Sequence, residues 1–97
     1  MTIMTIEQKI ENLFESFWDK YKVSRLSAHD STLYHLLLYF MEENKSASFE
    51  ARLTDINRYL RLSNEKIVSC LISLTNEGFI KCKQVDKGLF NITICDG

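Results

Sequence analysis

The apolar residues of the first twenty-one positions recur every three or four residues, with charged side chains in the gaps. This spacing is typical of an amphipathic helix. Thr5 followed three residues later by Gln8 is a capping-box pattern, so the helix is predicted to begin near Ile6 and to run to about Tyr21. Its apolar stripe, rich in aromatic residues, is Ile3, Ile6, Ile10, Leu13, Phe14, Phe17, Trp18 and Tyr21.

A second helix is predicted from Ser27, whose hydroxyl can accept from the third backbone amide, to about Asn44. Asp30 falls in its first turn, where the helix dipole favours a negative charge. Residues 49–53 then alternate apolar and polar side chains, which predicts a short strand. The core face of the second helix is expected to consist of Leu33, Leu36, Leu37, Phe40 and Met41.

The next segment has the pattern of two helices joined by a tight turn. Thr54 is a good N-cap for a short helix that would end near Leu60, and residues 62–63 form the break. A longer helix should run from Asn64 to Glu77 and stop at Gly78, which suits the left-handed position after a helix. Two helices with a turn of three or four residues are typical of a helix-turn-helix.

After Gly78 the apolar period changes from 3.6 to 2, which predicts a β-hairpin with its turn at residues 86–88. If Val85 pairs with Leu89, Gly88 takes the left-handed site of a three-residue turn. The same register places Ile80 opposite Ile94 and Cys82 opposite Ile92 on one face, which can close over the helices.

This order of elements resembles the winged helix-turn-helix domain. The predicted fold class is α+β, mainly α: a three-helix core plus a β-hairpin wing, with an extra N-terminal amphipathic helix. Residues 1–26 are expected to form a helical arm and residues 27–97 the winged-helix domain. The resemblance is carried by residues 53–56 at the start of the motif, the turn at 62–63, Ile67, Leu71 and Leu74 in the second motif helix, and residues 77–80 before the wing.

A narrower resemblance lies at residues 14–23, Leu26, Ser27 and the helix from Leu33 to Phe40. These segments look like the N-terminal domain of DnaD-type replication initiation proteins. In that family the domain is a winged helix preceded by a helical arm, and it serves primosome assembly on DNA and self-association. The resemblance therefore implies a replication or mobile-element assembly, although a counterpart of the family's second, C-terminal domain is missing from this sequence.

Charge is divided unevenly along the 97 residues, which carry 12 Lys+Arg and 13 Asp+Glu in total. Residues 1–51 hold five basic and eight acidic side chains, whereas residues 52–95 hold seven basic and four acidic ones. The motif half therefore has the positive balance that phosphate contacts require. The three cysteines form no metal-binding or redox pair, and we expect free thiols in a reducing cytoplasm. No apolar run approaches the ~20 residues of a membrane span, and no signal peptide is evident.

Duplex DNA is the partner that the motif half predicts. The second motif helix carries no Arg or Gln on its outer side, so strong sequence specificity is not expected. Asn64 can pair with adenine and Val68 can touch a thymine methyl group, whereas Glu65 would repel phosphate. The candidate DNA-binding residues are Arg58, Arg61, Asn64, Lys66, Ser69, Ser73, Lys81, Lys83 and Lys87.

Apolar side chains at predicted surface positions indicate a second type of contact. The aromatic stripe of the first helix is covered either by its own domain or by another subunit, and self-association through this helix is one interpretation. Val68 and Ile72 lie one turn apart where DNA readers are usually polar, so this surface can also pack on protein. The candidate interface residues are Phe14, Phe17, Trp18, Tyr21, Val68 and Ile72.

Enzymatic chemistry has no support in the sequence. His29 and His35 lack a Cys or carboxylate at a catalytic spacing, and no phosphate loop or hydrolase motif occurs. We expect no metal, no cofactor and no small-molecule substrate. The leading hypothesis is a DNA-binding winged-helix protein of weak sequence specificity in a replication or mobile-element assembly. A winged-helix transcriptional regulator and a protein-interaction module without DNA binding are the alternatives.

Overall fold

The computed structural model describes residues 5–22 and 25–95. The chain begins with α1 (Ile6–Tyr21) and α2 (Ala28–Asn44), which confirms both predicted helices. Each begins with a complete capping box, formed by Thr5 with Gln8 and by Ser27 with Asp30. Ile3 and Val23, which belong to the predicted stripe and to the DnaD-like segment, lie outside the described residues.

The helix-turn-helix consists of α3 (Leu53–Tyr59) and α4 (Asn64–Asn76). Ser63 caps α4, and Gly78 follows it in the left-handed conformation at φ 81°, as predicted. The predicted cap at Thr54 is wrong, because α3 begins one residue earlier, directly at the end of a strand. The Leu53 amide donates to the Gly88 carbonyl at 2.9 Å, so the first helical amide is satisfied by the wing rather than by a side chain.

Three antiparallel strands form the sheet in the order β1-β3-β2: β1 (Ser48–Arg52), β2 (Ile80–Asp86) and β3 (Leu89–Ile94). The predicted pairs of Ile80 with Ile94 and of Cys82 with Ile92 are confirmed. The predicted pair of Val85 with Leu89 is wrong. The register shifts after Gln84, and Asp86 faces Leu89, because Leu89 is also held by Arg52 of β1 and the turn is fixed from both sides.

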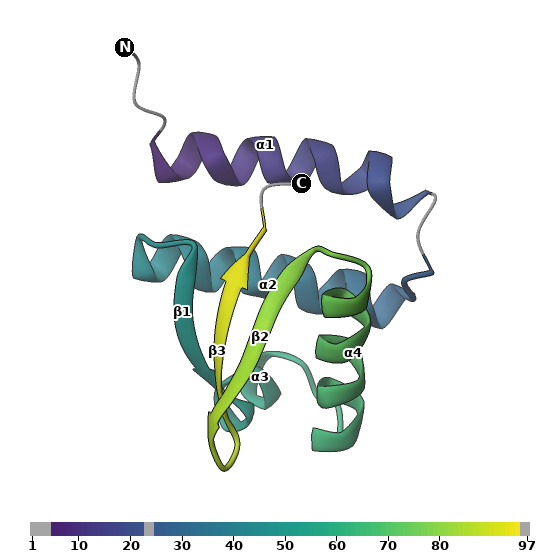
Figure 1. Ribbon diagram of the computed structural model, residues 1–97, viewed down its shortest axis with the longest axis vertical. Helices are drawn as coiled ribbons and strands as arrows, with labels where there is room; N and C mark the ends of the chain where they lie inside the picture. The colour runs from purple at the N-terminus through teal and green to yellow at the C-terminus, as the bar shows by residue number, and fades with distance from the viewer. Residues whose placement is uncertain (1–4, 23–24, 96–97) are drawn as a thin grey trace.

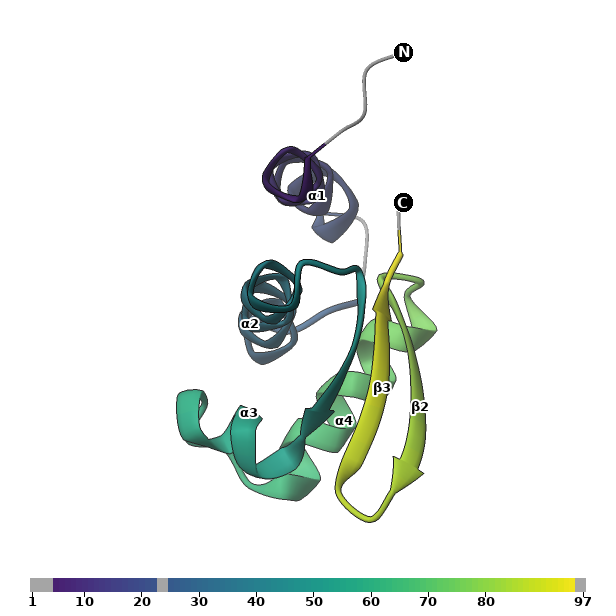
Figure 2. The ribbon, with the colours of Figure 1, turned by 90° about the vertical axis from the view of Figure 1, so that its left-hand side faces the viewer.

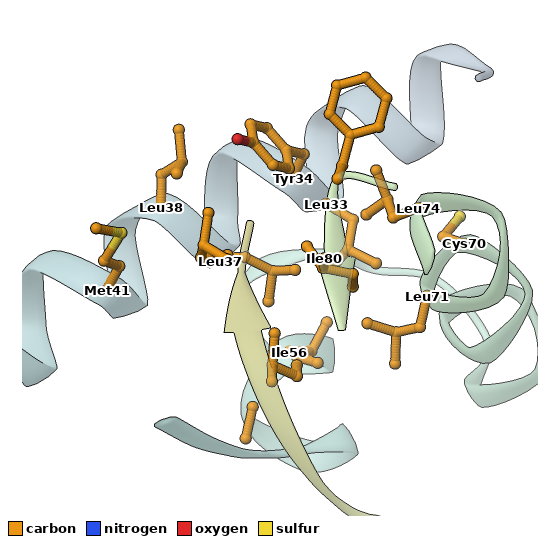
Figure 3. Close-up of a cluster of buried hydrophobic side chains, with 14 of the residues drawn as sticks. Leu33, Tyr34, Leu37, Leu38, Met41, Ile56, Cys70, Leu71, Leu74 and Ile80 are labelled. Atoms are coloured by element: carbon orange, nitrogen blue, oxygen red, sulfur yellow. The ribbon is translucent and has the colours of Figure 1, made fainter. Parts of the chain in front are cut away.

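A single core lies between the helices and one face of the sheet (Figures 1 and 2). Side chains from α2, α3, α4 and β2 point toward one another in its centre, where they lose their contact with water (Figure 3). These elements form the three-helix core and wing of the winged helix-turn-helix fold, with α1 added. The central residues are Leu33, Leu37, Ile56, Leu71 and Ile80.

Phe17 is the most deeply buried side chain of the first helix and packs into this core. Phe17 is only 1% exposed and stacks on Tyr34 of α2 with ring centroids 4.6 Å apart, and it also contacts Phe79 at 5.2 Å. Leu13 is buried beside it, whereas Phe14 and Trp18 remain exposed. The domain therefore covers part of the predicted stripe itself. None of the described helices is long and apolar enough to cross a membrane.

Candidate nucleic-acid interface

The outer side of α4 is a nearly uncharged surface. The helix turns Ile67, Cys70, Leu71 and Leu74 into the core, so the intervening residues face solvent. Six of these residues line a shallow hollow of about 490 Å³, and Glu65 is the one charged side chain among them. We call this surface the α4 face and define it as Asn64, Glu65, Val68, Ser69, Ile72 and Ser73.

The predicted base-reading residues of the α4 face are not equally free to act. Asn64 accepts a hydrogen bond at its Oδ1 from Asn57 Nδ2 of α3 at 2.7 Å. Because adenine is read by both the amide oxygen and the amide nitrogen, this contact competes with bidentate pairing. Ile72, in contrast, is 55% exposed, and Val68 beside it is half-buried.

A second hollow, of about 330 Å³, separates α4 from the wing. No charged side chain lines it. Cys82 of β2 lies in its wall, where burial raises the pKa of the thiol and keeps it in the neutral form. Ile72 borders this hollow as well as the hollow of the α4 face, so it lies on the ridge between the two.

Lys81, Lys83 and Lys87 of the wing lie in two different regions of its surface. Lys81 and Lys83 pair with Thr93 and Asn91 on the outer face of the sheet, opposite the face that covers the core. Lys87 lies in the turn between β2 and β3. From Lys81 to Lys87 the strand extends over about 20 Å. In both views the turn lies at the end of the molecule that holds the start of α4, and α1 lies at the opposite end (Figures 1 and 2).

One cation that was missing from the predicted site lies at the wing turn. Arg52 is the exposed last residue of β1 and pairs with Leu89, next to Lys87 and Gly88. The signal in the sequence was a basic residue at the end of a predicted strand, but the partner of that strand was not predicted. We call Arg52 and Lys87 the wing-turn cations. Asp86, whose carboxylate accepts from the Lys87 amide at 2.8 Å, lies beside them.

The remaining predicted cations fall into two groups. Arg61 is exposed in the turn between α3 and α4, and Lys66 is exposed in the first turn of α4, so both lie close to the α4 face. Arg58 belongs to a different surface. It lines a small hollow of about 180 Å³ between α2, β1 and α3 that also contains Glu50 and Asp55. The structure therefore does not place Arg58 among the residues of the α4 face.

The predicted protein-contact residues of α1 fall into a buried group and an exposed group. Phe17 is buried in its own core, so its assignment to a partner surface is wrong, and Tyr21 is half-buried. Phe14 and Trp18 are 42% and 47% exposed and pack around His35, with ring centroids 4.7 and 5.6 Å from it. These two residues form what we call the α1 pair.

The described residues include one fully buried thiol, that of Cys70, and two half-buried ones, those of Cys82 and Cys95. Within residues 5–22 and 25–95, no three His, Cys, Asp or Glu side chains come together as a metal ion would require. Cys70 is buried beside Asp30, and burial followed by that carboxyl group raises the pKa of its thiol to about 12. The thiol is therefore unreactive in the folded protein.

Comparison with known proteins gives two structural matches and no sequence family. No family model matches the chain, and no curated protein matches it. The chain is similar to reduced AbfR bound to DNA, with 28% identity and a TM-score of 0.53, over 91% of this chain and 60% of that one. Overoxidized AbfR bound to DNA matches with 27% identity and a TM-score of 0.47, over 93% of this chain and 72% of that one.

The present chain thus spans about 60% of the length of the first matching structure. That match supports the winged-helix fold. It does not support the narrower resemblance to DnaD-type proteins.

Proposed function

We propose that this protein binds duplex DNA through the α4 face and the wing-turn cations. The observation that carries the proposal is the similarity to reduced AbfR in a complex with DNA, which extends over 91% of the chain. In winged-helix proteins the second motif helix enters the major groove and the wing contacts the flanking backbone.

The distribution of charge is consistent with this mode of binding. The cations near the α4 face are Arg61 and Lys66, and the wing turn adds Arg52 and Lys87. Four positive side chains at one end of the molecule are sufficient for the salt-dependent binding that phosphate contacts produce, despite a net charge of −1 for the whole chain.

The test is fluorescence anisotropy of a labelled duplex titrated with protein at several salt concentrations. With four phosphate contacts the affinity should fall roughly 150-fold between 50 and 200 mM salt. Absence of binding at 50 mM salt would overturn the proposal. Binding that does not change with salt would exclude the cations as its source.

For the role of the DNA complex, we place transcriptional regulation ahead of replication or mobile-element assembly. The DnaD-like resemblance depended on residues 14–23, on Leu26 and Ser27, and on the helix from Leu33 to Phe40. In the first of these segments Phe17 serves the core of its own domain, as any amphipathic helix would require. Selection from random duplexes discriminates the two roles. A regulator returns one recurrent site, whereas an assembly protein returns none.

A protein-interaction module is the second candidate function. The observation in its favour is Ile72, 55% exposed beside an uncharged hollow of about 330 Å³. Light scattering on the protein used for the anisotropy titration provides the test. A dimer or larger species without DNA binding at 50 mM salt would favour this candidate.

A further inference from the structure

The chemistry of the α4 face is unusual for a helix that reads DNA. Its exposed centre is Ile72, with Val68 one turn earlier on the same side and the hydroxyl groups of Ser69 and Ser73 beside them. Positive side chains and glutamine are absent from the six residues of this face. The face therefore offers apolar surface and small hydroxyl groups to whatever it meets.

The chemical groups that each base presents in the major groove determine which base such a surface can recognise. Guanine is read bidentately by Arg or Lys and adenine by Asn or Gln, whereas Glu can accept from cytosine and Ser can contact several bases. The α4 face has none of the bidentate readers except Asn64, whose side-chain oxygen is already paired with Asn57 at 2.7 Å, and Glu65 lies two turns before Ile72. Among the four bases, thymine alone presents an apolar group in the major groove, its C5-methyl. An exposed isoleucine is complementary to that group.

The position of Ile72 on α4 also favours a contact with the thymine methyl group. Ile72 lies on the ridge between the hollow of the α4 face and the hollow beside the wing, and both hollows leave room next to its side chain. Val68 lines both hollows too, so the two apolar side chains form one continuous strip of α4. Glu65 at the first turn disfavours close approach of phosphate at the same place.

We propose that α4 recognises thymine methyl groups in the major groove, with Ile72 as the main contact and Val68 as its support. This inference rests on the proposed DNA binding and adds the base feature that is read. It predicts a preference for A·T pairs that depends on the methyl group and not on hydrogen bonds to the bases.

The experiment compares two duplexes of the same A·T-rich sequence, one with thymine and one with uracil at every thymine position. Loss of one buried methyl group should weaken binding roughly fourfold, and loss of two more than tenfold. A converse pair, a G·C duplex with cytosine or with 5-methylcytosine, should show tighter binding to the methylated form. This second pair separates the methyl contact from any change in duplex flexibility.

Two variants identify the side chain responsible. Ile72→Ser should remove the difference between the thymine and uracil duplexes, and the readout is the ratio of the two affinities, so a loss common to both duplexes cancels. The Ile72 side chain is 55% exposed, so its truncation leaves the core intact. Trp18→Ser, a comparably exposed apolar residue on α1, should keep the full difference.

The outcomes separate this inference from the proposed function. Equal binding of thymine and uracil duplexes would overturn the methyl contact and leave DNA binding standing. An equal loss on both duplexes in Ile72→Ser would also overturn it, because Ile72 would then act without regard to the methyl group. Absence of binding to any duplex at 50 mM salt would overturn the DNA function itself, and the methyl contact with it.

Discussion

Helices α1 and α4 both expose apolar side chains, and the surroundings of these side chains differ. On α1 the exposed Phe14 and Trp18 pack around His35 and are flanked along the helix by Glu11, Glu15 and Asp19. On α4 the exposed Ile72 is bordered by serines and by two hollows. The apolar side chains of the two helices are thus similarly exposed, but those of α1 are surrounded by acidic residues and Ile72 of α4 by almost neutral ones.

If the proposed DNA binding is correct, this difference suits the two surfaces to different partners. Acidic side chains around the α1 pair repel phosphate, so that surface is suited to protein and not to nucleic acid. The α4 face carries one carboxylate, and Arg61 and Lys66 lie close to it, so it can approach DNA. Because the two patches are similarly exposed, the surrounding charge is what distinguishes them.

The largest effect is expected from the buried neighbour of the α1 pair. Phe17→Ala should lower the free energy of unfolding by about 3–5 kcal/mol, because the side chain stacks on Tyr34 and leaves a cavity when it is truncated. Trp18→Ala, adjacent but half-exposed, should cost less than about 1 kcal/mol. Urea denaturation of the two variants provides the measurement. Equal losses would mean that α1 is not attached to the core through Phe17.

Reversal of the wing-turn cations should have the next largest effect. Arg52→Glu with Lys87→Glu should weaken binding to duplex DNA about 100-fold at 50 mM salt and reduce the slope of log affinity against log salt by about 2. The matched control is Lys20→Glu with Lys22→Glu at the end of α1, which changes the net charge equally. If both pairs lose the same affinity in anisotropy titrations, overall charge rather than the wing turn determines binding.

The α1 pair provides the test of self-association. Phe14→Ser with Trp18→Ser should weaken association of the chain with itself about tenfold or more, because exposed aromatic residues contribute much of the energy of protein interfaces. Sedimentation velocity over a range of concentrations measures the change. Affinity for a duplex too short for two copies should remain that of the unaltered protein. A wild-type chain that is monomeric throughout would contradict this prediction.

The smallest effect concerns the lysines along β2. Lys83→Glu should weaken DNA binding about threefold, and Lys81→Glu less than about twofold, because Lys81 lies about 20 Å from the turn. Both variants remove the same charge from the same face of the sheet, so each is the control for the other. Anisotropy titrations that give the reverse order would place the DNA at the α1 end of the wing.

Local signals in the sequence predicted the elements accurately. The capping boxes at Thr5 and Ser27, the stop at Gly78 and the pairing of Ile80 with Ile94 each depend on residues close together in the chain or on a strict period. Amphipathic spacing and capping chemistry act within a few residues, so a single sequence contains the information they need.

The predictions were wrong where the structure of an element depends on a segment far away in the sequence. The start of α3 is set by the Gly88 carbonyl, more than thirty positions away in the chain, and not by Thr54. Arg52 joined the candidate site only when β1 paired with β3, which no local pattern specifies. The stripe of α1 predicted an apolar face but could not indicate that Phe17 is buried and Trp18 exposed.

The place of β3 in the middle of the sheet has a consequence for the order of folding. During synthesis β1 leaves the ribosome first, and α3, α4 and β2 follow before its partner β3 is complete. Until then β1 is an unpaired edge that carries Phe49 and Ala51, the kind of edge that invites pairing with another chain. β1 therefore cannot be paired within the sheet until β3 is available, and an unpaired β1 is a part of the nascent chain that is open to misassembly.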